Sequence, residues 1–194
     1  MIRGGPRARS LALRALFFCA LAFGGPALAE EDVWRAIERG GVAVMIRHAQ
    51  TEPGVGDPPG FRMEDCGTQR NLSEEGRAHA RRIGAAFRQH GISPVRVLSS
   101  QWCRCIETAE LAFREHEPEP VLNSFFGERR AEPGQSAAVK RLVSGVRRGE
   151  VLMLVTHQVN ITALIRSAVA PGEVVVLAPA EFGEVRLVGR LAIP

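Results

Sequence analysis

The sequence predicts an α/β fold of three layers, a three-layer sandwich with a mainly parallel β-sheet between helices on both of its faces. Residues 42–46 (VAVMI) and 151–155 (VLMLV) are apolar runs without a polar interruption, which is typical of parallel strands buried on both faces. Each run ends in a polar segment that contains a histidine. Because open α/β sheets bind ligands at the carboxyl ends of their strands, we expect functional residues at these two points.

Shorter patterns predict the remaining elements in chain order. Ser73 followed by two acidic residues is a typical helix start, and Gly40 and Gly149 mark predicted helix ends. Helices are therefore expected over 32–39, 74–89, 101–113, 135–148 and 161–169. Further strands are expected over 95–99, 174–177 and 185–193, the last two as antiparallel additions near the C-terminus.

Residues 1–29 have the pattern of a secretory signal peptide. A basic start precedes an apolar core over 15–23, and the small-residue site Ala-Leu-Ala ends at Ala29. Cleavage after Ala29 would leave residues 30–194 as a single domain in the periplasm or outside the cell. A retained membrane anchor is the alternative, but the apolar core is much shorter than the ~20 residues of a spanning helix, so we expect no stable membrane insertion after cleavage.

Composition narrows the classes of partner. With 45 % hydrophobic residues, a chain of 194 residues can form a substantial core. Four of the 25 basic residues precede Glu30, and removing them leaves 21, equal to the 21 acidic residues. The basic sequence pI therefore gives no reason to expect nucleic acid as a partner, and no pattern indicates an oligomeric state.

The connection over residues 52–70 is long for a compact domain and rich in Gly and Pro, so we expect it to lie over the pocket. Export would place the cysteines where disulfides persist. Our hypothesis is that Cys66 pairs with Cys103 or Cys105, which would attach this loop to the segment around Arg104. Three free thiols and a metal site made by the three cysteines are the alternatives, although no fourth ligand stands at a recognisable spacing.

Residues 47–51, Arg-His-Ala-Gln-Thr, directly follow the first predicted strand. They resemble the Arg-His-Gly-x-Thr signature of the histidine phosphatase superfamily, which includes the cofactor-dependent phosphoglycerate mutases. The resemblance implies a phosphoglycerate mutase-like sheet, with His48 attacking a phosphoryl group and carrying it as phosphohistidine. It further implies that Arg47 holds phosphate oxygens. Thr51 is expected to order the loop and to contact phosphate.

Two other segments are similar to motifs of this superfamily. Residues 99–109, Ser-Ser-Gln-Trp-Cys-Arg-Cys-Ile-Glu-Thr-Ala, are similar to Ser-Ser-x-x-x-Arg-Ala-x-x-Thr-Ala, which implies that Arg104 lies in the phosphate pocket. An arginine early in a helix suits this role, because guanidinium binds phosphate bidentately and the free N–H groups of a helix start favour anions. Residues 72–80 are similar to Leu-Ser/Thr-x-x-Gly-x-x-Gln-Ala, with His79 in place of the usual glutamine.

His157 ends the second apolar run, where the superfamily has its second essential histidine, and the resemblance implies that it donates to phosphoryl oxygens. Gln158 follows it, so the branch that uses an aspartate there as its acid is not indicated. Superfamily members often take their proton donor from a glutamate between the pocket arginine and this histidine. By order along the chain Glu128 is the first candidate and Glu132 the second. The rivals on the long loop are Glu52, Asp57 and Asp65.

These features predict a metal-independent phosphomonoester hydrolase that is exported and acts on a small phosphorylated substrate or a phosphorylated envelope component. No cofactor or metal is expected, because two arginines supply the charge that Mg²⁺ would otherwise bring. Export favours a phosphatase over a phosphoglycerate mutase-type phosphotransferase, which needs a cytoplasmic phosphorylated cofactor. The alternatives of another class are a non-catalytic phosphate- or phosphosugar-binding module on the same fold and a cysteine-based metal or redox protein.

Overall fold

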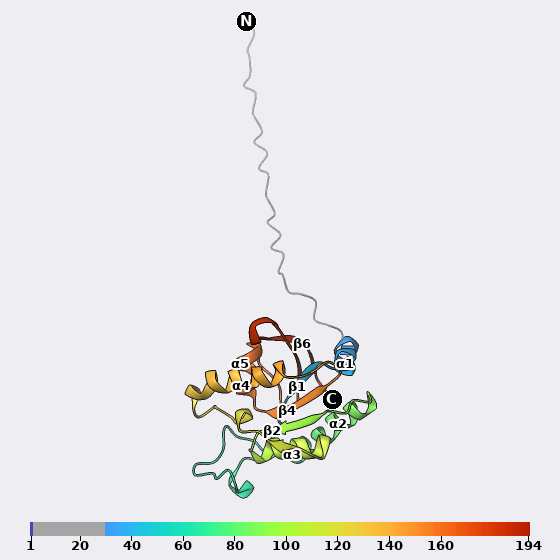
Figure 1. Ribbon diagram of the computed structural model, residues 1–194. Helices are drawn as coiled ribbons and strands as arrows, with labels where there is room; N and C mark the ends of the chain where they lie inside the picture. The colour runs from blue at the N-terminus through green and yellow to red at the C-terminus, as the bar shows by residue number, and fades with distance from the viewer. Residues whose placement is uncertain (2–29) are drawn as a thin grey trace.

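Strands of the computed structural model form one six-stranded sheet (Figure 1). The strands are β1 Val42–Arg47, β2 Arg96–Ser99, β3 Glu117–Pro118, β4 Val151–Thr156, β5 Val174–Pro179 and β6 Val185–Leu191. Their order is β3-β2-β4-β1-β5-β6. Neighbours from β3 to β1 run parallel, whereas β5 and β6 are antiparallel additions. The structure describes Met1 and residues 30–194, so the predicted signal peptide lies, apart from Met1, outside the described residues.

Helices cover both faces of this sheet (Figure 1). They are α1 Glu30–Arg39, α2 Glu74–Gln89, α3 Cys103–Phe113, α4 Glu132–Ser144 and α5 Gln158–Ile165. Helices α1, α2 and α3 pack on one face, and α4 and α5 pack on the other. The predicted three-layer α/β fold is confirmed. None of the helices within residues 30–194 is long and apolar enough to cross a bilayer.

Strand β1 is apolar along its length because it is buried on both faces. Val44 belongs to the apolar cluster beneath α1, α2 and α3, which includes Phe87. The next residue, Met45, points to the opposite face and belongs to the cluster beneath α4 and α5, which includes Ile161. Strand β4 shows the same burial at every position. Both strands therefore lie in the middle of the sheet, and their polar ends open at one edge.

The ends of two helices differ from the prediction. Helix α4 was expected over 135–148, but it begins at Glu132 and ends at Ser144. Its last carbonyl groups accept hydrogen bonds from the backbone N–H of Gly145, so the helix ends well before Gly149. Helix α5 was expected over 161–169 and instead begins directly after β4 and ends before Arg166, whose φ of 57° stops it. Glycine spacing alone therefore misplaced these boundaries.

The long loop between β1 and α2 is attached to the start of α3. A disulfide joins Cys66 to Cys103, and Cys105 is free and buried. The predicted pairing of Cys66 with one of two cysteines is confirmed, and its partner is Cys103. Since two of the three cysteines are bonded to each other, they are not ligands of a metal site. The side chain of Gln69 adds a second attachment, because its Oε1 accepts a 3.0 Å hydrogen bond from the Cys103 N–H.

Helix α2 holds the segment that follows β1 through a close backbone contact. A Cβ atom at Gly76 would lie 1.9 Å from the carbonyl oxygen of Gln50, so only glycine allows the helix to approach this far. That same oxygen accepts a 3.0 Å hydrogen bond from the backbone N–H of Ser73, whose side chain caps the helix. The Leu-Ser-x-x-Gly pattern therefore positions the chain just after His48.

We expect the disulfide to contribute substantially to stability. Replacing Cys66 and Cys103 together by alanine should lower the free energy of unfolding by about 3–4 kcal/mol, because the bond closes a loop with a sequence separation of 37 residues. Urea unfolding of both proteins, with and without reductant, measures this difference. Reductant should destabilise the wild type and leave the double variant unchanged. A wild-type midpoint that does not respond to reduction would contradict the prediction.

Candidate active site

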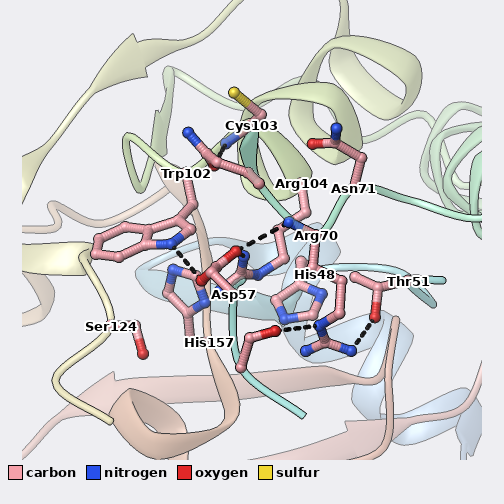
Figure 2. Close-up of polar contacts among 12 residues, drawn as sticks. His48, Thr51, Asp57, Arg70, Asn71, Trp102, Cys103, Arg104, Ser124 and His157 are labelled. Carbon is pink, nitrogen blue, oxygen red and sulfur yellow. Dashed lines mark hydrogen bonds and ion pairs between the residues drawn. The ribbon is translucent and has the colours of Figure 1, made fainter. Parts of the chain in front are cut away.

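Two buried histidines meet where β1 and β4 end. The strands pair in parallel with Arg47 opposite Thr156, so His48 and His157 follow side by side. Their ring centroids are 5.4 Å apart and the rings are inclined by 68°. The backbone N–H of His48 also donates a 2.9 Å hydrogen bond to the carbonyl of Thr156. Figure 2 shows the two rings next to each other among the arginines of the pocket.

His48 is held in one tautomer. Its ring is buried, with the residue 5 % exposed, and Nδ1 lies 2.9 Å from the backbone oxygen of Ala49. A carbonyl oxygen can only accept, so Nδ1 carries the proton and Nε2 keeps a free lone pair. Burial, followed by the charge of Arg104, lowers the pKa of His48 to about 3. The imidazole is therefore neutral at pH 7, with Nε2 available as a nucleophile.

His157 is oriented by hydrogen bonds from the neighbouring strand end. Its Nε2 lies 2.8 Å from Oγ of Ser100, whose hydroxyl is in turn 3.1 Å from Oδ1 of Asn123. The amide oxygen can only accept, so the hydroxyl donates to Asn123 and accepts from the Nε2–H of His157. Burial, then the neighbouring His48, lowers the pKa of His157 well below its ordinary value. His157 is thus a neutral N–H donor inside the pocket.

Arg104, the second residue of α3, is paired with Asp57 of the long loop. Their side chains are only 5 % and 7 % exposed, and Nη1 of Arg104 lies 2.7 Å from Oδ1 of Asp57. The carboxylate also accepts a 2.9 Å hydrogen bond from the indole N–H of Trp102 and a 3.1 Å bond from the backbone N–H of Arg70. Burial raises the pKa of Asp57, but these three donors outweigh it and hold the pKa below its ordinary value.

Two more guanidinium groups lie close enough to affect this pocket. Arg47 donates a 2.6 Å hydrogen bond to the carbonyl of Val169, and its Nε is buried without a partner in the described part of the chain. Arg70 donates from Nη1 to Oγ1 of Thr51 at 2.5 Å. Burial and the nearby Arg70 and Arg104 charges lower the pKa of Arg47. The site is therefore rich in positive charge, which suits an anionic ligand.

The structure brings together most of the predicted site residues: His48, His157, Arg104 and Arg47. Thr51 lies at the same edge and holds Arg70, which agrees with its expected part in ordering the loop, while its contact with phosphate stays a prediction. Sequence reasoning missed Arg70, because a single arginine at the end of an irregular loop carries no periodic or motif signal. Its position between the loop and the Leu-Ser-x-x-Gly pattern was the available indication.

Glu128 is not gathered with these residues. Its side chain is exposed and makes no hydrogen bond or ion pair with the described residues 30–194, and Glu132 begins α4. Its role as proton donor stays a prediction. Among the loop rivals, Asp65 caps the short helix Cys66–Thr68, whereas Asp57 contacts the pocket arginine directly.

Cys105 lies beside the histidines but is not a reactive thiolate. Its Sγ is 3.5 Å from Nε2 of His157 and 3.6 Å from the carbonyl oxygen of Thr156. Burial raises the pKa of this thiol to about 12, so it is protonated at pH 7. With Cys66 and Cys103 joined, the cysteines act here as structural groups, and no cluster of three metal-binding side chains occurs among the residues that the structure describes.

Comparison with known proteins agrees with this arrangement. The model of the histidine phosphatase superfamily (branch 1) matches residues 43–135, which contain both the Arg-His-Ala-Gln-Thr segment and Arg104. The fold is shared with the protein histidine phosphatase SixA complexed with tungstate, at 16 % identity and a TM-score of 0.56, over 78 % of this chain and 96 % of that one. The chain belongs to the histidine phosphatase superfamily.

Another superfamily structure, the phosphoglycerate mutase from Thermus thermophilus, has 20 % identity and a TM-score of 0.53, over 79 % of this chain and 99 % of that one. At these identities the likeness shows a common fold, and the activity of each neighbour is its own. No curated protein matches the chain in sequence. Function must therefore be argued from the site.

The low pKa of His48 makes stability depend on pH. The unfolded chain protonates this histidine near its ordinary pKa of 6.5, whereas the folded protein does so only near pH 3. The unfolded state thus binds more protons within this window, and stability falls as the pH is lowered through it. We expect the wild type to lose about 1.4 kcal/mol per pH unit below pH 6 relative to His48→Asn, as measured by urea unfolding. Parallel stability curves for the two proteins would contradict this.

Proposed function

We propose that the protein is a phosphomonoester hydrolase that works through a phosphohistidine on His48 and requires no metal ion. The observation that carries this proposal is the fixed tautomer of His48, whose Nδ1–H donates to Ala49 and leaves Nε2 free within the arginine pocket. A nitrogen nucleophile that is neutral at pH 7 and surrounded by guanidinium groups is suited to attack a phosphoryl group.

Arg104 and Arg47 bind the phosphoryl oxygens in this proposal. Each has a buried Nε without a partner among the described residues, so each retains a donor that a phosphate oxygen can use. Guanidinium groups also neutralise the charge that spreads over the equatorial oxygens during transfer. They stand preorganised in a buried site, where such donors stabilise developing charge more strongly than water does.

The reaction then takes two steps. In the first, the Nε2 lone pair of His48 forms a bond to phosphorus while the bond from phosphorus to the leaving oxygen breaks, and that oxygen takes up a proton. In the second, water attacks phosphorus, the N–P bond breaks, and its electron pair returns to Nε2. His157 supplies an N–H donor to the phosphoryl oxygens during both steps, from a ring centred 5.4 Å from that of His48.

We infer that the protein works in the periplasm or outside the cell. The signal-peptide pattern of residues 1–29 supports this, and so does the Cys66–Cys103 disulfide, since disulfides persist in oxidising compartments. The substrate is then a small phosphorylated molecule or a phosphorylated envelope component, without nucleic acid as a partner. A hydrolase suits such a compartment better than a mutase that depends on a cytoplasmic phosphorylated cofactor.

The proposal predicts turnover of 4-nitrophenyl phosphate in the presence of EDTA. His48→Ala should lower the rate by at least about 10³-fold, because no other group can carry the phosphoryl. His79→Gln is the matched control, since this histidine lies on α2 and bonds the carbonyl of Ile193 rather than pocket residues. It should keep wild-type activity. Retention of a tenth of the rate by His48→Ala, or a requirement for Mg²⁺, would overturn the proposal.

A further inference from the structure

Phosphoryl transfer to His48 requires an acid for the leaving oxygen. We propose that Asp57 is this acid, and that phosphate brings it into action by displacing it from Arg104. The inference rests on the proposed function and names the catalytic residue that the function leaves unassigned.

Asp57 occupies the place that a phosphate oxygen would take on the pocket arginine. Its Oδ1 lies 2.7 Å from Nη1 of Arg104, and its Oδ2 accepts the indole N–H of Trp102 at 2.9 Å. Figure 2 shows the carboxylate pointing into the pocket between these groups, on the side of the two histidines. The indole ring itself lies against His157, with ring centroids 5.3 Å apart. A substrate phosphate that reaches Arg104 must therefore meet this carboxylate.

Displacement supplies the proton that the reaction needs. In the free protein Asp57 is ionised, because three donors stabilise its charge. When phosphate takes Arg104, the carboxylate loses its cationic partner and gains a negative neighbour, and both changes favour its protonated form. It takes this proton from solvent or from a phosphate monoanion. The acid then gives the proton to the leaving oxygen as the P–O bond breaks, and the carboxylate receives one from the attacking water in the second step.

The loop keeps the displaced carboxyl near the reacting atoms. Arg70 donates from Nε to the carbonyl of Gly56 at 2.8 Å and from Nη1 to the carbonyl of Gly54 at 3.0 Å, so it holds the backbone just before Asp57. Farther along, the Cys66–Cys103 disulfide attaches the loop to α3. Rotation of the side chain is therefore enough to move the carboxyl from Arg104 toward the leaving group. Glu128, on the exposed surface, has no comparable connection to the pocket.

The test is the dependence of kcat/KM on the leaving group for the full chain, with 4-nitrophenyl phosphate and phenyl phosphate as substrates. The two are similar in size, but phenolate is the more basic leaving group and needs the acid more. Asp57→Asn should lower kcat/KM for phenyl phosphate by about 10²-fold or more, and for 4-nitrophenyl phosphate by less than about tenfold. Glu128→Gln is the control and should change neither value.

Binding of inorganic phosphate provides a second readout that a merely structural role would not move in this direction. Asp57→Asn removes the competing negative charge while its amide oxygen can still accept from Arg104 and Trp102. We expect this variant to bind phosphate about tenfold more tightly than the wild type, as measured by calorimetry. Near-ultraviolet circular dichroism establishes that the variant is folded.

Each other outcome is decisive. An equal loss with both substrates would show that Asp57 only positions Arg104, and a gain with both would show that it only blocks the pocket. Either result would overturn the inference, as would a selective loss of phenyl phosphate turnover in Glu128→Gln. Absence of turnover by the wild type with both substrates would overturn the proposed function itself, and this inference with it.

Discussion

The parallel pairing of β1 with β4 is the constraint on which the site depends. Because Arg47 lies opposite Thr156, the two residues that follow, His48 and His157, leave the sheet at adjacent points and in the same direction. Both strands are buried on both faces, and a slip of one residue would turn every side chain to the other face. The packing of Val44 and Met45 against opposite helix layers therefore also fixes the spacing of the histidines.

Burial and positive charge act together on these rings. Both effects lower the pKa of His48 and of His157, so the pocket holds neutral imidazoles beside cationic arginines. The same charges attract an anion, which means that the electrostatics of substrate binding and of nucleophile activation have one origin. Asp57 balances part of this charge through Arg104 in the free protein. We propose that a bound phosphate takes over this part.

The elements with strong local signals could be predicted from the sequence. The two apolar runs identified the central strands, and their polar ends identified His48 and His157, whereas Arg104 depended on the resemblance to a family motif. The contact between Asp57 and Arg104 could not be predicted, because the loop takes its path from a disulfide and from the hydrogen bonds of Arg70, neither of which has a period in the sequence. Helix ends set by backbone geometry, as at Arg166, were misplaced for a similar reason.

The central claim is that His48 carries the phosphoryl group, and trapping the phosphoenzyme tests it most directly. The protein is mixed with a phosphomonoester, quenched in alkali during turnover, digested, and examined by mass spectrometry and phosphorus nuclear magnetic resonance. The account predicts one phosphoryl group on Nε2 of His48, stable in alkali and labile in acid as a phosphoramidate. Phosphate on any other residue, or steady turnover without a phosphorylated His48, would contradict it.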